Sequence, residues 1–257
     1  MQNYYFVVPS LPPLSMHDRP EISFQEFITR MEISLNKKDL EKTKVLRLFI
    51  DICNIRALLM EEPVDPRGNL NEKELDEALL VHAGLPEYVF EFLEQFEKVS
   101  DKIKNFSGLF ARYFNEEIVK QEGFLRAYLT FERESRLVLL ALRAKRLGRD
   151  VARELQFEDP TDPLIAHILA QKDSDSYDPP PEYTDLKELI VACHGDPWKE
   201  NKAFAEYRFK KLGELAEGEM FSIDQILCYM AQLMIIEDLD ELDEERGKMI
   251  LDTFKSG

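Results

Sequence analysis

Apolar residues recur at every third or fourth position along most of the chain, which is the spacing of amphipathic helices. The clearest stretch carries Val45, Leu48, Phe49, Ile52 and Ile55 on one helical face. The same spacing predicts helices over residues 23–35, 40–60, 71–84, 87–104, 107–147 with a break at Gly123, 162–170, 185–193, 196–215, 222–236 and 242–254. The pattern therefore predicts an all-α fold.

Capping signals support several of these helices. Ser23-x-x-Glu26, Asn71-x-x-Glu74 and Ser222-x-x-Gln225 have the spacing of a capping box, in which two side chains satisfy free amides of the first helical turn. Asp39 is expected to cap the helix over 40–60, and Asp162 with Pro163 is expected to open a short helix.

The N-terminal segment has a different character. Residues 4–8 are aromatic or β-branched, and three prolines follow before residue 14, which predicts a short strand or an extended arm. Such an arm either lies over the protein's own helices or binds a partner by strand addition or as a Pro-rich ligand. Tyr4 and Tyr5 are its candidate contact residues.

The composition divides the chain into four segments. Residues 1–22 form the Pro-rich arm, and residues 23–171 form a helical region. Residues 172–182 (KDSDSYDPPPE) are polar, acidic and rich in proline, which predicts a flexible linker. Residues 183–257 are expected to form C-terminal helices that pack on the same domain.

Charge excludes two classes of partner. With 33 basic and 50 acidic residues, the net charge is −17, so phosphate backbones and anionic lipids would repel the surface. Three separated cysteines indicate reduced thiols. The sequence shows neither the pattern of a signal peptide nor an apolar run longer than residues 137–142. We therefore expect a cytoplasmic protein that reaches a membrane only through partner subunits.

No motif in the sequence indicates catalysis. The metalloprotease, nucleophile-elbow, P-loop and dinucleotide-binding patterns are absent. Cys193 and His194 are adjacent, but a catalytic pair is defined in space, and we interpret them as a buried cysteine at a helix end. The run over 237–245 (EDLDELDEE) lacks the glycine and final glutamate of a calcium loop, and we interpret it as a solvated connection between two helices.

We therefore predict a non-catalytic protein without cofactor or metal. An enzyme whose site is assembled from scattered acids, Tyr and His stays open as an alternative.

A basic stretch stands out against the acidic background. It either pairs with acidic residues of the protein, such as Glu132 and Glu134 on the same helix, or forms a docking surface for an acidic partner. Its members are Arg126, Arg133, Arg136, Arg143, Lys145, Arg146, Arg149 and Arg153.

The same stretch resembles a known helix. TFERESRLVLLALRAKRLG (130–148) is similar to the repeated helix of the C-type subunit of V/A-type ATP synthases, with Glu134 and the Leu142–Lys145 ending at the matching positions. LFIDICNIRALL (48–59) resembles a second copy, with Asp51, Asn54 and Arg56, and MAQLMIIEDLDELDEERG (230–247) a third, with Glu237. The two copies differ at two positions. Leu137 stands where the copy over 48–59 has Asn54, and Met60 stands where the copy over 130–148 has Arg143.

Across nearly the whole chain, the opening YYFVVPSLPPL and the closing IDQILCYMAQLMIIEDLDELDEERGKMIL resemble an uncharacterised bacterial family that is encoded beside V/A-type ATP synthase subunits. The resemblance implies an elongated bundle of repeated helical units. It also implies a socket that couples the central shaft to the membrane rotor ring during ion transport. The alternative function is a free-standing helical adaptor or regulator. The candidate interface residues are Tyr4, Tyr5, Asp51, Asn54, Arg56, Arg126, Arg133, Glu134, Arg136, Arg143 and Lys145.

Overall fold

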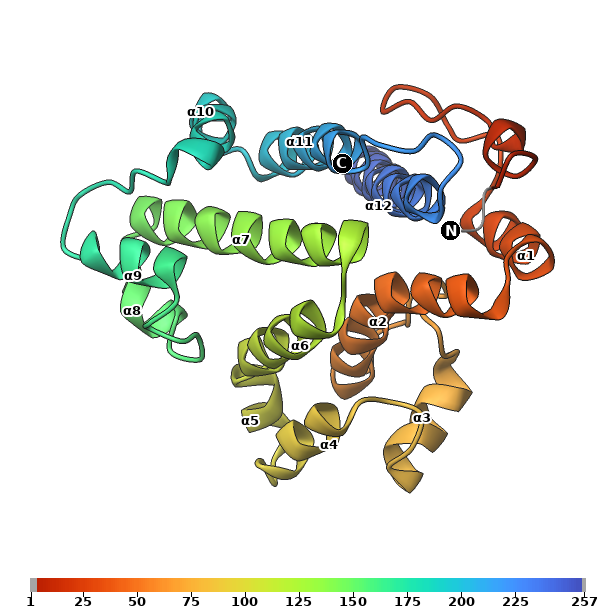
Figure 1. Ribbon diagram of the computed structural model, residues 1–257. Coiled ribbons are helices and arrows are strands. Elements are labelled where there is room, and N and C mark those ends of the chain that lie inside the picture. Colours follow the sequence, from red (N-terminus) through yellow and green to blue (C-terminus); the bar gives the residue numbers. More distant parts are fainter. Residues whose placement is uncertain (1–3, 256–257) are drawn as a thin grey trace. The chain divides into compact units, whose positions relative to one another are not determined.

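The computed structural model describes residues 4–255, with side chains for residues 4–242. Within these residues the chain forms helices and no strand, so the all-α prediction is confirmed (Figure 1). The elements are η1 (Val8–Ser10), α1 (Phe24–Ser34), α2 (Lys37–Leu59), α3 (Glu72–Val81), α4 (Glu87–Glu94), α5 (Val99–Lys104), α6 (Ser107–Lys120), α7 (Gly123–Arg146), α8 (Val151–Glu154), α9 (Pro163–Ala170), η2 (Pro181–Tyr183), α10 (Thr184–Ala192), α11 (Pro197–Leu215) and α12 (Ile223–Lys255).

The chain divides into two compact units. One combines residues 1–43 with residues 188–257, and the other comprises residues 44–187. The divisions fall inside α2 and α10. The first unit therefore joins the two ends of the chain, and α1 is grouped with the C-terminal helices.

In the first unit, α12 packs against α11 and α1. Its core contains the fully buried Phe27, whose ring stacks on that of Tyr229 with centroids 5.4 Å apart. The N-terminal arm lies on this unit. Tyr4 is buried, its amide donates to the carbonyl of Phe221 at 2.7 Å, and its hydroxyl donates to Asp39 at 2.6 Å.

The arm is not a strand. Residues 5–7 form a turn that leads into η1, because Pro9 favours the 3-10 conformation and has no amide to give to a sheet. Of the two interpretations of the arm, the one that lays it over the protein's own helices accounts for buried Tyr4.

In the second unit, α7 is the central helix, and α6, α8 and α9 pack against it, while α4 packs on α6 (Figure 1). Aromatic side chains fill the space between α2 and α6. The ring of Phe49 lies 5.5 Å from that of Tyr113 and 6.0 Å from that of Phe114, measured between centroids. Gly123 has φ +57°, which separates α6 from α7 as the sequence predicts.

Two predicted helix boundaries are wrong. Residues 87–104 form two helices rather than one, because the chain turns at residues 95–98 and brings the rings of Phe96 and Phe106 to the edge of Phe92, 5.4 and 5.9 Å away. Conversely, residues 222–254 contain one helix, α12, rather than two. Leu239 is buried and continues the apolar stripe through the acidic run, so the expected connection does not form.

Two predicted caps also differ. Asn36 accepts a hydrogen bond from the Asp39 amide at 3.0 Å, so Asn36 rather than Asp39 holds the first turn of α2. The side chain of Gln225 donates to the carbonyl of Ala216 at 2.5 Å, which directs it away from a capping box with Ser222.

The acidic segment over 172–182 is anchored to its surroundings. Lys145 on α7 donates to the carbonyls of Lys172 and Ser174, each at 2.6 Å. Tyr177 is 1% exposed, and Asp178 forms an ion pair with Lys187 on α10. None of the helices in the described residues combines the length and hydropathy of a membrane span.

Candidate functional site

Buried polar side chains on α2 hold the loop that leads to α3. Asp51 is 1% exposed and accepts hydrogen bonds from the amide of Leu70 at 3.1 Å and the side chain of Asn69 at 2.7 Å. Asn54, also buried, bonds to both the amide and the carbonyl of Asp65, each at 2.8 Å. The loop over 65–70 is therefore fixed to α2 at both of its ends.

A glycine makes this close approach possible. A Cβ atom on Gly68 would lie 2.6 Å from Oδ1 of Asp51 and 3.0 Å from Nδ2 of Asn54. Arg47, one turn earlier on α2, donates to the carbonyls of Arg67 and Gly68 and presses the same loop against the helix. The loop can reach the carboxylate only because residue 68 has no side chain.

On α7, Arg133 and Glu134 hold later segments of the chain in a similar way. Arg133 is 7% exposed and forms ion pairs with Glu158 and Asp162, each at 2.9 Å. Burial acts to lower the pKa of this guanidinium, but Glu158 and Asp162 outweigh it and raise the pKa, so Arg133 stays charged. Glu134 accepts a hydrogen bond from the hydroxyl of Tyr183 at 2.7 Å, one residue before α10 begins.

The third long helix, α12, repeats the arrangement within the first unit. Glu237 accepts a hydrogen bond from the amide of Phe24 at 2.7 Å. Phe24 is the first residue of α1, and its N-cap, Ser23, forms the predicted capping box with Glu26. A carboxylate in the middle of α12 therefore satisfies a free amide at the start of another helix.

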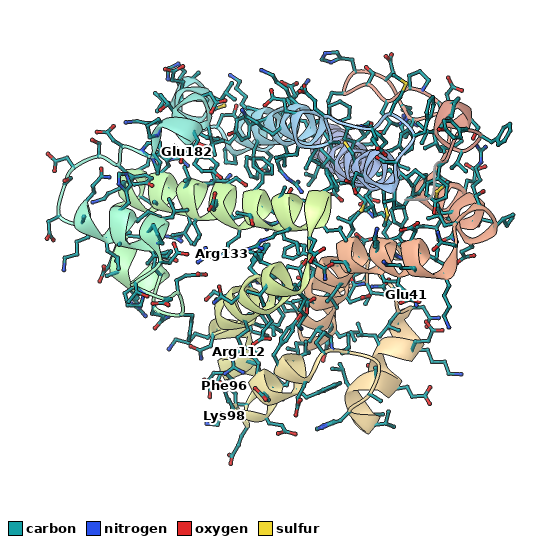
Figure 2. All side chains as sticks on the ribbon, viewed as in Figure 1. Glu41, Phe96, Lys98, Arg112, Arg133 and Glu182 are labelled. Atoms are coloured by element: carbon teal, nitrogen blue, oxygen red, sulfur yellow. The ribbon has the colours of Figure 1, made fainter. Side chains whose placement is uncertain are left out.

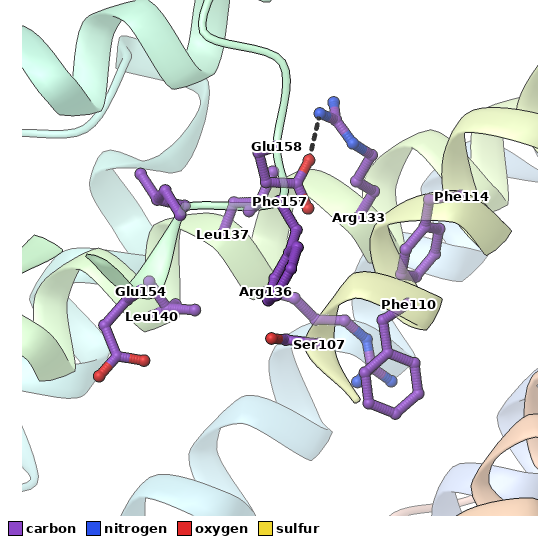
Figure 3. Close-up of a pocket in the computed structure, with 11 residues that line it drawn as sticks. Ser107, Phe110, Phe114, Arg133, Arg136, Leu137, Leu140, Glu154, Phe157 and Glu158 are labelled. Carbon is purple, nitrogen blue, oxygen red and sulfur yellow. Dashed lines mark hydrogen bonds and ion pairs between the residues drawn. The ribbon is translucent and has the colours of Figure 1, made fainter. Parts of the chain in front are cut away.

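A cavity of about 170 Å³ lies between α6, α7 and α8 in the second unit (Figure 3). Phe157, from the segment after α8, points into it and packs on Gly108, where an added Cβ would be 3.2 Å from the ring. The remaining lining is mostly apolar, and comes from Phe110, Phe114, Leu137, Leu140 and Leu155 with Ser107, Arg133, Arg136, Glu154 and Glu158.

The arginines of the cavity are engaged with the protein itself. Arg133 is paired with Glu158, as Figure 3 shows. The guanidinium of Arg136 lies over the ring of Phe49, 4.3 Å from its centroid, and its Nε is 3.6 Å from Glu132. Neither histidine nor cysteine is among the lining residues.

The predicted interface residues fall into three groups. Tyr4, Asp51, Asn54 and Arg133 are buried, and their polar atoms act within the fold rather than on a contact surface. Glu134, Arg136, Arg143 and Lys145 are partly buried. Tyr5, Arg56 and Arg126 are exposed.

Within the basic stretch, the internal-pairing interpretation accounts for Arg133, Arg136 and Arg149. Arg136 pairs with Glu132, as expected for i and i+4 positions, and Arg149 lies 3.7 Å from Glu154. Arg149 and Arg153 also line an open polar cleft of about 600 Å³ with Lys104. The stretch is therefore partly internal and partly exposed.

Sequence reasoning missed the partners of these anchors. Glu158 and Tyr183 are separated from Arg133 and Glu134 by 25 and 49 positions, and no local pattern connects them. Cys193 is buried after the last residue of α10, as expected: its thiol donates to the Leu189 carbonyl at 3.2 Å, and His194 has φ +51°. In the described part of the chain, no three His, Cys, Asp or Glu residues cluster as a metal site.

We predict that Gly68→Ala destabilises the protein by about 2 kcal/mol, because the new methyl group would collide with the buried Asp51 carboxylate and displace the loop. The lower chain entropy of alanine offsets only part of this cost. The free energy of unfolding in urea measures the effect. Gly218→Ala is the matched control, because a Cβ at that position has no heavy atom within 4 Å. Equal stability of the two variants would show that Asp51 does not constrain the loop.

Asp51 also predicts a pH dependence. Burial raises its pKa, and the hydrogen bonds from Leu70 and Asn69 only partly offset this. The folded state therefore retains the proton longer than the unfolded state, and this group's contribution to stability falls as the pH rises from about 4. Asp51→Asn should remove that decline from the pH profile of the unfolding free energy.

The pKa of Asp39 is shifted in the opposite direction to that of Asp51, so its variant is the comparison for this measurement. Its burial acts to raise the pKa, but hydrogen bonds from Tyr4, Lys42 and Asn36 together lower it. Its contribution to stability is therefore present above a pH of about 4 and is lost as the pH falls. Asp39→Asn should lower stability at neutral pH and have less effect in acid, and identical profiles for the two variants would contradict these assignments.

Comparison with known proteins identifies full-length relatives. The chain is 26% identical to an uncharacterized protein of Chlamydia muridarum and 24% identical to one of Chlamydia trachomatis, each over 263 residues that cover 100% of this chain and 99% of the relative. It is 28% identical to an uncharacterized protein of Chlamydia pneumoniae over 98% of this chain and 97% of that one. No solved structure matches. The family described as "Protein of unknown function (DUF2764)" matches residues 1–257, and the chain belongs to this family.

Proposed function

We propose that the chain is a non-catalytic subunit or assembly component of a V/A-type ATP synthase, similar to the C-type socket that couples the central shaft to the membrane rotor ring. The observation that carries this proposal is the shared role of Asp51, Glu134 and Glu237. The resemblance to the repeated helix equates these three acids. In the structure each lies on one of the three longest described helices and accepts a hydrogen bond from near the start of a shorter helix.

The departures from the repeat have structural counterparts. Asn54 in the first copy fixes the following loop, whereas its equivalent Leu137 lines the apolar cavity under Phe157. In that second copy, Arg133 holds the loop over 158–162 instead. Arg133 thus holds a loop on α7 as Asn54 does on α2, although it stands at a different position of the helix. This supports the proposal that the two helices belong to repeat units that hold different loops.

A socket that transmits torque requires helices that do not shift against one another. Buried hydrogen bonds and ion pairs between helices supply such resistance, since breaking one leaves an uncompensated polar group. The exposed Arg56 on α2 and Arg126 on α7 are then candidate contacts for the shaft or the ring. The acidic surface would select partners by charge.

Deletion of the chain from an organism that encodes it should uncouple the ATP synthase. We expect ATP hydrolysis by the catalytic head to persist in membranes or extracts, and ATP-driven ion transport to be lost. Both are measured on the same preparation, and re-expression is the control. Arg56→Glu and Arg126→Glu should reduce recovery of shaft and ring subunits with the tagged chain about tenfold, since each reverses an exposed charge.

Lys210→Glu, on the exposed side of α11, is the matched charge reversal and should retain the partners. Normal ion transport in the deletion strain, together with no recovery of ATP synthase subunits by the tagged chain, would contradict the proposal.

The exposed arm favours a second candidate, the free-standing adaptor. Phe6 is 93% and Tyr5 is 56% exposed, and the Tyr5 ring contacts Phe221 with centroids 4.9 Å apart. Phe6→Asp should then abolish partner binding without loss of stability, because the side chain is already in solvent. Val119→Asp, at a position that is 72% exposed on α6, is the control. If Phe6→Asp leaves every recovered partner in place, measured by quantitative mass spectrometry, the arm is not the contact.

A further inference from the structure

A second cavity, of about 380 Å³, opens where α2, α3, α4 and α5 meet in the second unit. Six of its ten lining residues are apolar, and the other four are His82, Glu94, Glu97 and Lys102. We call it the α3–α4 groove, and its apolar lining residues are Ile55, Leu59, Leu79, Phe90, Leu93 and Phe96. The lining of the α3–α4 groove comes entirely from residues 55–102. The cavity between α6, α7 and α8, in contrast, receives the side chain of Phe157 from the segment after α8.

Several large apolar side chains that are close in sequence to the groove's lining residues are exposed. Helix α3 buries only Leu75 and Ala78, whereas Leu80 and Val81 are 83% and 63% exposed. At the ends of the neighbouring helices, Met60 after α2 and Val99 at the start of α5 are 37% and 47% exposed. Large apolar side chains that stay in water next to an apolar groove are typical of a binding surface.

The sequence around the groove is strongly acidic. Residues 60–102 contain twelve acidic and four basic residues, so about a sixth of the chain carries eight of its seventeen net negative charges. One of the four, Arg67, is engaged in an ion pair with Asp65. At the groove itself, Glu94 lies 3.3 Å from His82, and its side chain is 65% exposed. Phe96 and Lys98 lie at the outer edge of this region in Figure 2.

We propose that the α3–α4 groove binds an amphipathic helix of a partner protein, with apolar anchors on one face and Lys or Arg residues on its flanks. Apolar anchors at i, i+3 or i+4 and i+7 would fill the groove against Leu79, and the docked helix would extend over the adjoining Leu80. The acids of this segment, with Glu94 and Glu97 at the groove itself, select basic flanks and repel acidic ones.

The same charge disfavours two other occupants. A second copy of this chain would bring two strongly acidic segments together, and an anionic membrane would be repelled. The proposal does not depend on the ATP synthase assignment, because it follows from the groove and its charge alone.

The probe is a fluorescent, amphipathic helical peptide of about five turns, with leucine anchors and lysine flanks, titrated with the full-length protein. A second peptide has the same anchors and glutamate flanks. We expect the lysine peptide to bind at least tenfold more tightly than the glutamate peptide, and its affinity to fall several-fold between about 50 and 300 mM salt. Absence of saturable binding of the lysine peptide, or equal binding of the two peptides, overturns the proposal.

Two matched variants locate the site. Leu80→Asp should weaken binding of the lysine peptide at least tenfold, whereas Ile33→Asp should not. Both residues are 83% exposed on helices, so neither change should affect the fold, which the thermal unfolding midpoint checks. Glu94→Lys with Glu97→Lys should reduce the preference for lysine flanks. Equal binding to both aspartate variants, or a dimer in sedimentation that the peptide does not dissociate, would overturn the proposed occupant.

Discussion

The structure depends on carboxylates of the long helices that accept hydrogen bonds from other segments of the chain; Asp51 is buried, and Glu134 and Glu237 are partly buried. A carboxylate removed from water is costly unless donors replace the lost solvent, and the amides at a helix start lack partners of their own. Asp51 accepts from the Leu70 amide just before α3, Glu134 accepts from the Tyr183 hydroxyl just before α10, and Glu237 accepts from the Phe24 amide at the start of α1. A carboxylate on each of the three longest described helices therefore holds a segment at or just before the start of a shorter helix, and at Phe24 it also satisfies a free helix amide. Because the third contact joins residue 237 to residue 24, the two ends of the chain enter the same unit.

These contacts also decide where loops can run. Helix α2 fixes the loop over 65–70 through Asp51 and Asn54, and this arrangement requires glycine at position 68. Helix α7 fixes the loop over 158–162 through Arg133 and the segment after α9 through Lys145. The long helices thus determine the path of the irregular segments, which keeps those segments ordered despite their polar, proline-rich composition. A rigid framework of this kind suits a protein that works through its surfaces.

Much of the fold can be predicted from local sequence signals. The hydrogen bonds and ion pairs between distant segments cannot. Capping boxes at Ser23 and Asn71, and the glycine at position 123, set helix limits because each acts within one turn. The division between α4 and α5 escapes a local pattern because it depends on Phe106, which lies about ten residues beyond the turn that it stabilises. The burial of Arg133 is equally hidden, since nothing local shows that Glu158 and Asp162 will enclose it. The resemblance to a repeated helix draws attention to Asp51, Glu134 and Glu237, and each of these acids accepts a hydrogen bond from another segment.

The distribution of engaged and exposed groups separates structural from functional surfaces. Inside the second unit, the guanidinium groups of Arg133 and Arg136 already contact acids or a ring of the same chain, so their charge is satisfied within the fold. On the surface, Leu80 and Val81 are exposed at the end of α3, whose Leu79 lines the α3–α4 groove, within a strongly acidic segment of the chain. Contacts within the fold account for the two arginines. Leu80 and Val81, in contrast, would leave water only through contact with a partner. The same reasoning applies to Phe6 in the first unit, so both units carry exposed apolar groups that contact with a partner would remove from water.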